Sequence, residues 1–71
     1  MTEKHKELVN TILTQFADNK EMTYSILGKS IVKMAVDIKI EELEDLLSYF
    51  TNFKEISEVD KILTYYKNLE L

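Results

Sequence analysis

The first apolar positions of the chain recur at the spacing of one face of an α-helix. The residues on this face are Leu8, Val9, Ile12, Leu13 and Phe16. Thr2 is suited to the N-cap of such a helix, and Glu3 places a negative charge in the first turn, where the helix dipole favours it. We therefore expect a helix over about residues 3–18.

The middle of the chain repeats the helical pattern at spacings of four, three and four residues. The residues of this stripe are Leu27, Ile31, Met34 and Ile38. Thr23 or Ser25 is expected to cap this helix. Gly28 lies inside the pattern, where glycine costs about 1 kcal/mol relative to alanine, and this indicates a close approach between helices. An alternative is that the helix begins near Gly28, after a loose turn.

Residues 36–40 alternate between apolar and polar side chains, which by itself is typical of a strand. No second alternating segment is present with which such a strand could pair. We therefore interpret residues 36–40 as a helix boundary, with Asp37 near the N-cap of the next helix. Neither Gly nor Pro enforces this break, so one continuous helix over about residues 24–52 is an alternative, and it would favour a dimer.

Two further helical stripes follow the boundary. The first ends near Thr51-Asn52 and carries Ile40, Leu43, Leu46, Leu47, Phe50 and Phe53. The second begins after a weak capping box over residues 57–60 and carries Val59, Ile62, Leu63, Tyr66 and Leu69. The sequence thus predicts an all-α fold, a compact bundle of three or four short helices in one domain over residues 1–71.

Several large apolar residues fall outside these stripes. They are Tyr24, Ile26, Val32, Val36, Tyr49, Ile56 and Tyr65. Some would widen the buried faces, and the others would form an exposed patch of the kind that marks an interface. A single core in a chain of this size rarely supplies more than about 3–5 kcal/mol, so we expect the protein to self-associate.

Composition narrows the classes of function. The chain has no Cys and one His, which excludes disulfides and thiolate metal sites, and we predict no metal, no cofactor and no enzymatic activity. Its net charge is −4 and all of its basic residues are Lys, which disfavours a nucleic-acid partner. It shows neither a secretory signal nor a segment apolar enough to span a membrane, so a cytoplasmic location is expected.

Negative charge is concentrated in residues 37–60, which carry a net charge of −6. The densest acidic group is Glu41, Glu42, Glu44 and Asp45. A helix surface is a poor calcium site, because Ca²⁺ prefers about six to eight oxygens from a wrapping loop. We interpret the group as a solvated helix face and as a candidate docking patch that would steer a basic partner.

Five of the seven aromatic residues lie between positions 49 and 66. We expect Phe50, Phe53 and Tyr66 in a core shared by the last two helices. Tyr49 and Tyr65 fall off the stripes, and Tyr is enriched at interfaces. The candidate partner-binding residues are therefore Tyr49, Phe53, Tyr65 and Tyr66, together with Glu41, Glu42, Glu44 and Asp45.

Three weaker patterns involve single residues. Residues 27–30 resemble the end of a phosphate-binding loop, but they lack its first glycine and the preceding strand. His5 is the only histidine, and we expect it to be exposed and without a special role. Gly28 could be the turn of a helix-turn-helix, although the second helix would be nearly all apolar and poorly suited to reading bases. Its phosphate-facing residues would be Lys29, Lys33 and Lys39.

Two functions follow from these observations. The first is a small acidic protein-interaction module that acts as an inhibitor, adaptor or accessory subunit and self-associates. The alternative is a DNA-binding regulator with a degenerate helix-turn-helix around Gly28.

Overall fold

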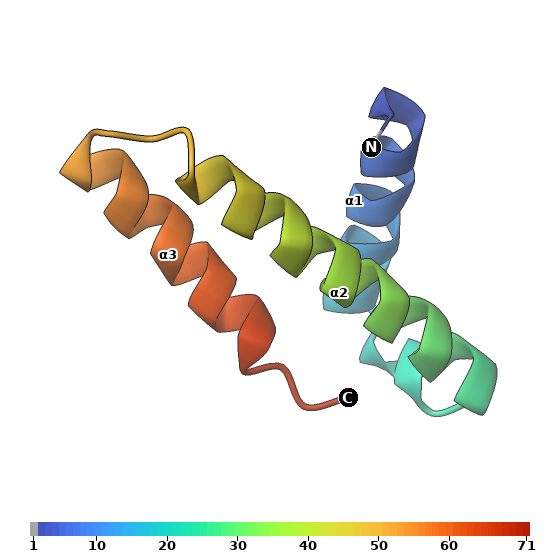
Figure 1. Ribbon diagram of the computed structural model, residues 1–71. Coiled ribbons are helices and arrows are strands. Elements are labelled where there is room, and N and C mark those ends of the chain that lie inside the picture. Colours follow the sequence, from blue (N-terminus) through green and yellow to red (C-terminus); the bar gives the residue numbers. More distant parts are fainter. Residues whose placement is uncertain (1) are drawn as a thin grey trace. The chain divides into compact units, whose positions relative to one another are not determined.

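The computed structural model describes residues 2–71, and they form three α-helices and one short 3-10 helix (Figure 1). The elements are α1 (Glu3–Asp18), η1 (Lys20–Thr23), α2 (Ile26–Leu47) and α3 (Phe53–Lys67). No strand occurs among residues 2–71, and the predicted all-α fold class is confirmed.

The described chain divides into two compact units, which meet within α2. The N-terminal unit contains residues 2–38 together with Leu71, and the C-terminal unit contains residues 39–70. The single domain expected over residues 1–71 stays a prediction.

Helix α1 begins and ends where the sequence predicts. The Thr2 hydroxyl accepts a hydrogen bond from the backbone N–H of His5 at 3.3 Å, which confirms Thr2 as the N-cap. On the predicted face, Val9, Leu13 and Phe16 are buried, whereas Leu8 is exposed. The local signals at this end of the chain were therefore sufficient to predict the helix.

The turn between α1 and α2 is built from side-chain caps and a close backbone approach. The Ser25 hydroxyl accepts a hydrogen bond from the N–H of Gly28 at 3.0 Å, so Ser25 is the residue that caps α2. Gly28 lies in the first turn of the helix and does not have a positive φ. The helix begins at Ile26, two residues before Gly28, which fits both the cap at Ser25 and the alternative of a start near Gly28. The predicted close approach is present, but the neighbour is the Met22 carbonyl of η1.

Helix α2 continues through residues 36–40 without a break (Figure 1). The predicted boundary there, with Asp37 as an N-cap, is wrong. The alternative of one long helix is confirmed in kind, although its bounds are Ile26–Leu47. With neither Gly nor Pro in the segment, nothing removes a backbone hydrogen bond or frees the chain to turn. The alternation is compatible with a helix because Val36 and Leu43, seven residues apart, are buried on one side of it.

The buried face of α2 in the N-terminal unit is not the one that the sequence pattern suggests. Val32 is fully buried, and Ala35 and Val36 are nearly so. In contrast, Leu27 is 72% exposed and Met34 is 64% exposed. The helix carries two apolar stripes, and the stripe with the smaller side chains is the one inside. Small side chains let packed helices approach more closely, which favours this choice.

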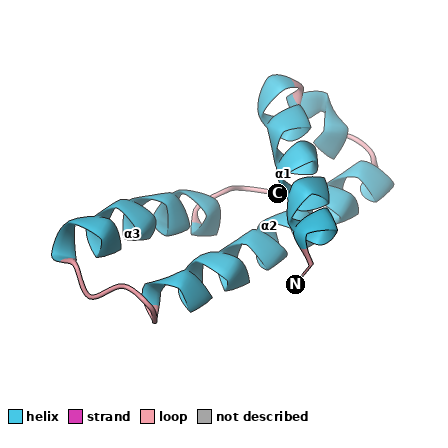
Figure 2. Cartoon of the chain, turned by 90° about the horizontal axis from the view of Figure 1, so that it is seen from above, coloured by secondary structure: helices cyan, strands magenta, loops and turns pink. Residues whose placement is uncertain are grey.

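The C-terminal unit is an antiparallel helical hairpin, in which the C-terminal part of α2 and α3 run side by side across the loop of residues 48–52 (Figure 2). Leu43 and Leu63 are its buried side chains, and Phe50 and Tyr66 are half-buried. Helix α3 begins at Phe53, one turn earlier than the predicted capping box. The reason is Asn52, whose side-chain oxygen accepts a hydrogen bond from the N–H of Lys54 at 2.8 Å.

Candidate protein-interaction surface

All eight candidate partner-binding residues lie in the C-terminal unit. Three of the four acidic candidates, Glu41, Glu44 and Asp45, are exposed on α2. Glu44 forms an ion pair with Lys67 of α3, with 3.6 Å between the Glu44 carboxylate and the Lys67 ammonium group. Both side chains are about half exposed, so solvent screens this pair and leaves the face free to attract a cationic partner.

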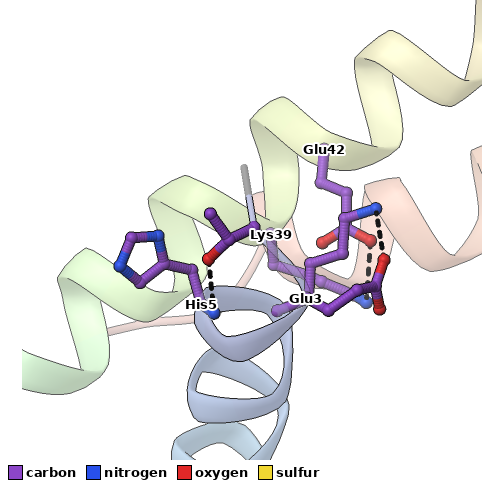
Figure 3. A network of polar contacts seen from close by, with 6 residues as sticks. Glu3, His5, Lys39 and Glu42 are labelled. Atoms are coloured by element: carbon purple, nitrogen blue, oxygen red, sulfur yellow. Dashed lines mark hydrogen bonds and ion pairs between the residues drawn. The ribbon is translucent and has the colours of Figure 1, made fainter.

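Glu42 differs from the other three carboxylates. Its side chain is only 17% exposed, and it forms an ion pair at 3.9 Å with Lys39, one turn earlier on α2 (Figure 3). Its second carboxylate oxygen is buried and has no hydrogen-bond partner among the described residues. Glu42 is therefore held against the protein, and it is less able to meet a partner than Glu41, Glu44 or Asp45.

Two aromatic candidates mark the loop end of the hairpin. Tyr49 lies just after the end of α2 and is 79% exposed, and Phe53 is the first residue of α3 and is 84% exposed. The expectation that Phe53 belongs to the core is wrong, because α3 begins at this residue and turns its ring outward. Two large exposed rings four positions apart form an apolar surface of the kind that marks a binding site.

The other two aromatic candidates lie near the opposite end of α3. The rings of Tyr65 and Tyr66 are 5.2 Å apart in an edge-to-face arrangement, with 71° between their planes. Tyr65 is exposed, whereas Tyr66 is half-buried, as expected for a core residue. Burial raises the pKa of Tyr66 above the usual 10.0, and the neighbouring Tyr65 hydroxyl raises it further.

The candidate residues thus form two groups rather than one patch. Phe53 and Tyr65 are twelve positions apart on α3, which corresponds to about 18 Å along the helix axis. The Glu44–Lys67 ion pair ties the acidic face of α2 to the Tyr65 end of α3. Tyr49 and Phe53 occupy the loop end.

The N-terminal unit carries an apolar surface that the sequence pattern assigned to the core. We call the residues Leu27, Ile31, Met34 and Ile38 the α2 stripe. The first three are exposed and Ile38 is half-buried. Ile26, the first residue of α2, and Tyr24, which follows η1, are exposed as well. The sequence contains a signal for this outcome. A second run of small apolar residues lies one position further along, and a helix with two stripes cannot bury both against one neighbour.

The residues of the predicted helix-turn-helix are arranged differently from that motif. Gly28 is inside α2 rather than in a turn. Lys29 and Lys33 are exposed, but Lys39 is only 17% exposed and pairs with Glu42. The prediction of a turn at Gly28, on which the DNA-binding alternative depended, is therefore wrong. Of the three residues expected to face phosphate, Lys39 is mostly covered.

Comparison of the chain with family models, with curated proteins and with solved structures finds no match.

Two other kinds of site were sought among residues 2–71. No group of three or more His, Cys, Asp or Glu side chains in this range could hold a metal ion. None of the described helices is both long enough and apolar enough to cross a membrane. His5 is exposed, and its contribution is the backbone N–H that Thr2 caps (Figure 3).

Proposed function

We propose that this chain is a small acidic protein-interaction module, with a basic protein as its partner and with the ability to self-associate. The observation that carries the proposal is the exposure of Tyr49 and Phe53 on an acidic unit. Residues 39–70 contain eight acidic residues and four Lys. Exposed aromatic anchors provide affinity, and the surrounding charge provides the choice of partner.

The two groups of candidate residues have different roles in this proposal. Tyr49 and Phe53 would insert into apolar pockets of the partner, because both side chains are mostly exposed. Glu41, Glu44 and Asp45 would accelerate association with a positively charged surface and make it sensitive to salt. Tyr65 would extend the contact at the far end of α3, while Tyr66 supports the ring of Tyr65.

The experiment is an affinity capture from cell extract, followed by titration of the purified partner. The variant Tyr49→Ala/Phe53→Ala should lose the captured partner, and Leu8→Ala, which shortens an exposed side chain of α1, should retain it. The triple variant Glu41→Gln/Glu44→Gln/Asp45→Asn should slow association at low salt and match the natural chain at high salt. An unchanged partner and an unchanged association rate in both variants would contradict the proposal.

A further inference from the structure

The α2 stripe has the spacing of a helix–helix seam. Its four residues follow one another at intervals of four, three and four positions, which is the spacing of the a and d positions of a coiled coil. Leu27, Ile31 and Met34 of the stripe are exposed, while Val32 and Val36 form the buried face of the same helix. The N-terminal unit therefore presents a second, largely exposed packing face.

We propose that a second copy of this chain covers the α2 stripe, with the two α2 helices antiparallel. This inference rests on the self-association in the proposed function and adds its surface and geometry. The stripe is complementary to itself in this alignment: Leu27 meets Ile38 of the second copy, and Ile31 meets Met34. Each contact occurs twice about the two-fold axis, as in most homodimers.

Charge favours the N-terminal unit over the C-terminal unit for contact with a second copy. Residues 1–38 contain five Lys and five acidic residues, so the unit that carries the stripe has no net charge to repel its own copy. Residues 39–70 have a net charge of −4, and two such units would repel each other. Self-association is therefore favoured at the N-terminal unit, and a basic partner at the C-terminal unit.

Charge also selects the antiparallel direction. Along α2 the spacing of the stripe continues with Glu41 and Asp45. A parallel pair would place each of these carboxylates against its own copy. An antiparallel pair centred on the stripe carries them past Ile26, the first residue of the other α2. There Glu41, about 3 Å beyond Ile26 along the axis, lies beside the positive end of that helix, which stabilises negative charge.

The exposed area is adequate for a dimer. Tyr24, Ile26, Leu27 and Met34 are each more than half exposed, and Ile31 adds to them. Side chains of this size give an apolar surface of several hundred Å², a substantial part of the roughly 800 Å² that each partner buries in a standard interface.

The first test measures the mass of the chain by sedimentation equilibrium at low and high micromolar concentration. The natural chain should be a dimer, and Met34→Lys should raise the dissociation constant by more than about tenfold, because the ammonium group would be placed at the seam. The control Leu8→Lys changes an apolar side chain of α1 with similar exposure and should leave the dimer intact. Circular dichroism should show equal helix content in all three proteins.

The second test reads the direction of pairing through disulfides, since the chain has no Cys of its own. A mixture of Leu27→Cys and Ile38→Cys should oxidise to the mixed dimer, which mass spectrometry distinguishes from either homodimer. In the antiparallel pair, the thiols of two Leu27→Cys chains would be about 16 Å apart along the axis, too far for a bond. Homodimers of Leu27→Cys would show a parallel pair and overturn the proposed geometry.

A natural chain that is monomeric at both concentrations would overturn the inference. It would leave the aromatic anchors of the partner-binding surface untouched, because they are tested separately through Tyr49 and Phe53. A dimeric natural chain together with an unchanged captured partner in Tyr49→Ala/Phe53→Ala would instead overturn the partner-binding surface and leave this inference intact.

Discussion

The backbone carbonyl of Met22 lies against the Cα of Gly28, so closely that a Cβ at position 28 would fall far inside van der Waals contact with the Met22 oxygen. The Ser25 hydroxyl would be 2.9 Å from the same Cβ. The clash is with backbone, which cannot rotate away as a side chain would. Gly28 is therefore required by the packing of η1 against the first turn of α2, and not by its own backbone conformation.

We expect Gly28→Ala to destabilise the protein. Helix propensity alone predicts a gain of about 1 kcal/mol for alanine within a helix. The overlap with the Met22 carbonyl should outweigh that gain and lower the free energy of unfolding by about 1–3 kcal/mol. Urea unfolding followed by circular dichroism measures the difference. The matched control is Ser30→Ala in the next turn of α2, at an exposed position, where we expect a change within about 0.5 kcal/mol. A stabilised Gly28→Ala protein would show that η1 does not pack as described.

The two apolar stripes of α2 should respond differently to truncation. We expect Val32→Ala to lower the free energy of unfolding by about 1–2 kcal/mol, because a fully buried side chain loses two methyl groups and leaves a cavity. Leu27→Ala removes more atoms from a side chain that is mostly exposed, and it should change the stability of the monomer by less than about 0.5 kcal/mol. Both variants should be unfolded with denaturant at a protein concentration below that at which the chain associates. The reverse order of the two effects would mean that the stripe predicted from the sequence is the core.

The sequence predicted those elements that are determined by neighbouring residues. Helix α1 has one apolar face and a capping threonine, so its position follows from local chemistry. Ser25 at the start of α2 is a similar case. The all-α class followed from helical spacing in every segment but one, and that one lacks a residue that could stop a helix.

The remaining features depend on which surfaces meet, and a periodic pattern does not contain that information. Leu27 and Val32 both belong to apolar stripes of α2, and only the packed structure shows that Val32 is inside. Among the candidate site residues, Glu42 looked equivalent to Glu41, yet its carboxylate is turned against the protein and paired with Lys39. The sequence offers two possible N-caps for the last helix, Asn52 and Ser57. Only the structure shows that Asn52 is the cap, which makes Phe53 the first residue of α3.

Alkaline pH should destabilise the fold through Tyr66. Its pKa in the folded protein is raised above the usual 10.0, first by burial and then by Tyr65, so the folded state keeps the proton more strongly than the unfolded state does. The resulting stability is complete below pH 10 and is lost as the pH rises through the pKa of the folded state. We expect the melting temperature of the natural chain to fall more steeply above pH 10 than that of Tyr66→Phe. Tyr49→Phe, which alters an exposed ring, should behave as the natural chain does. Parallel curves for all three proteins would remove Tyr66 as the cause.

The ion pair between Glu44 and Lys67 should contribute little to stability, although it links α2 to α3. Its 3.6 Å separation is long, and both side chains are about half exposed, so water and salt screen the attraction. A double-mutant cycle with Glu44→Gln and Lys67→Met should give a coupling energy below about 0.5 kcal/mol at low salt and none at high salt. A coupling of several times that size would show that Glu44 is committed to holding the hairpin together. In that case Glu41 and Asp45 alone would have to attract a basic partner.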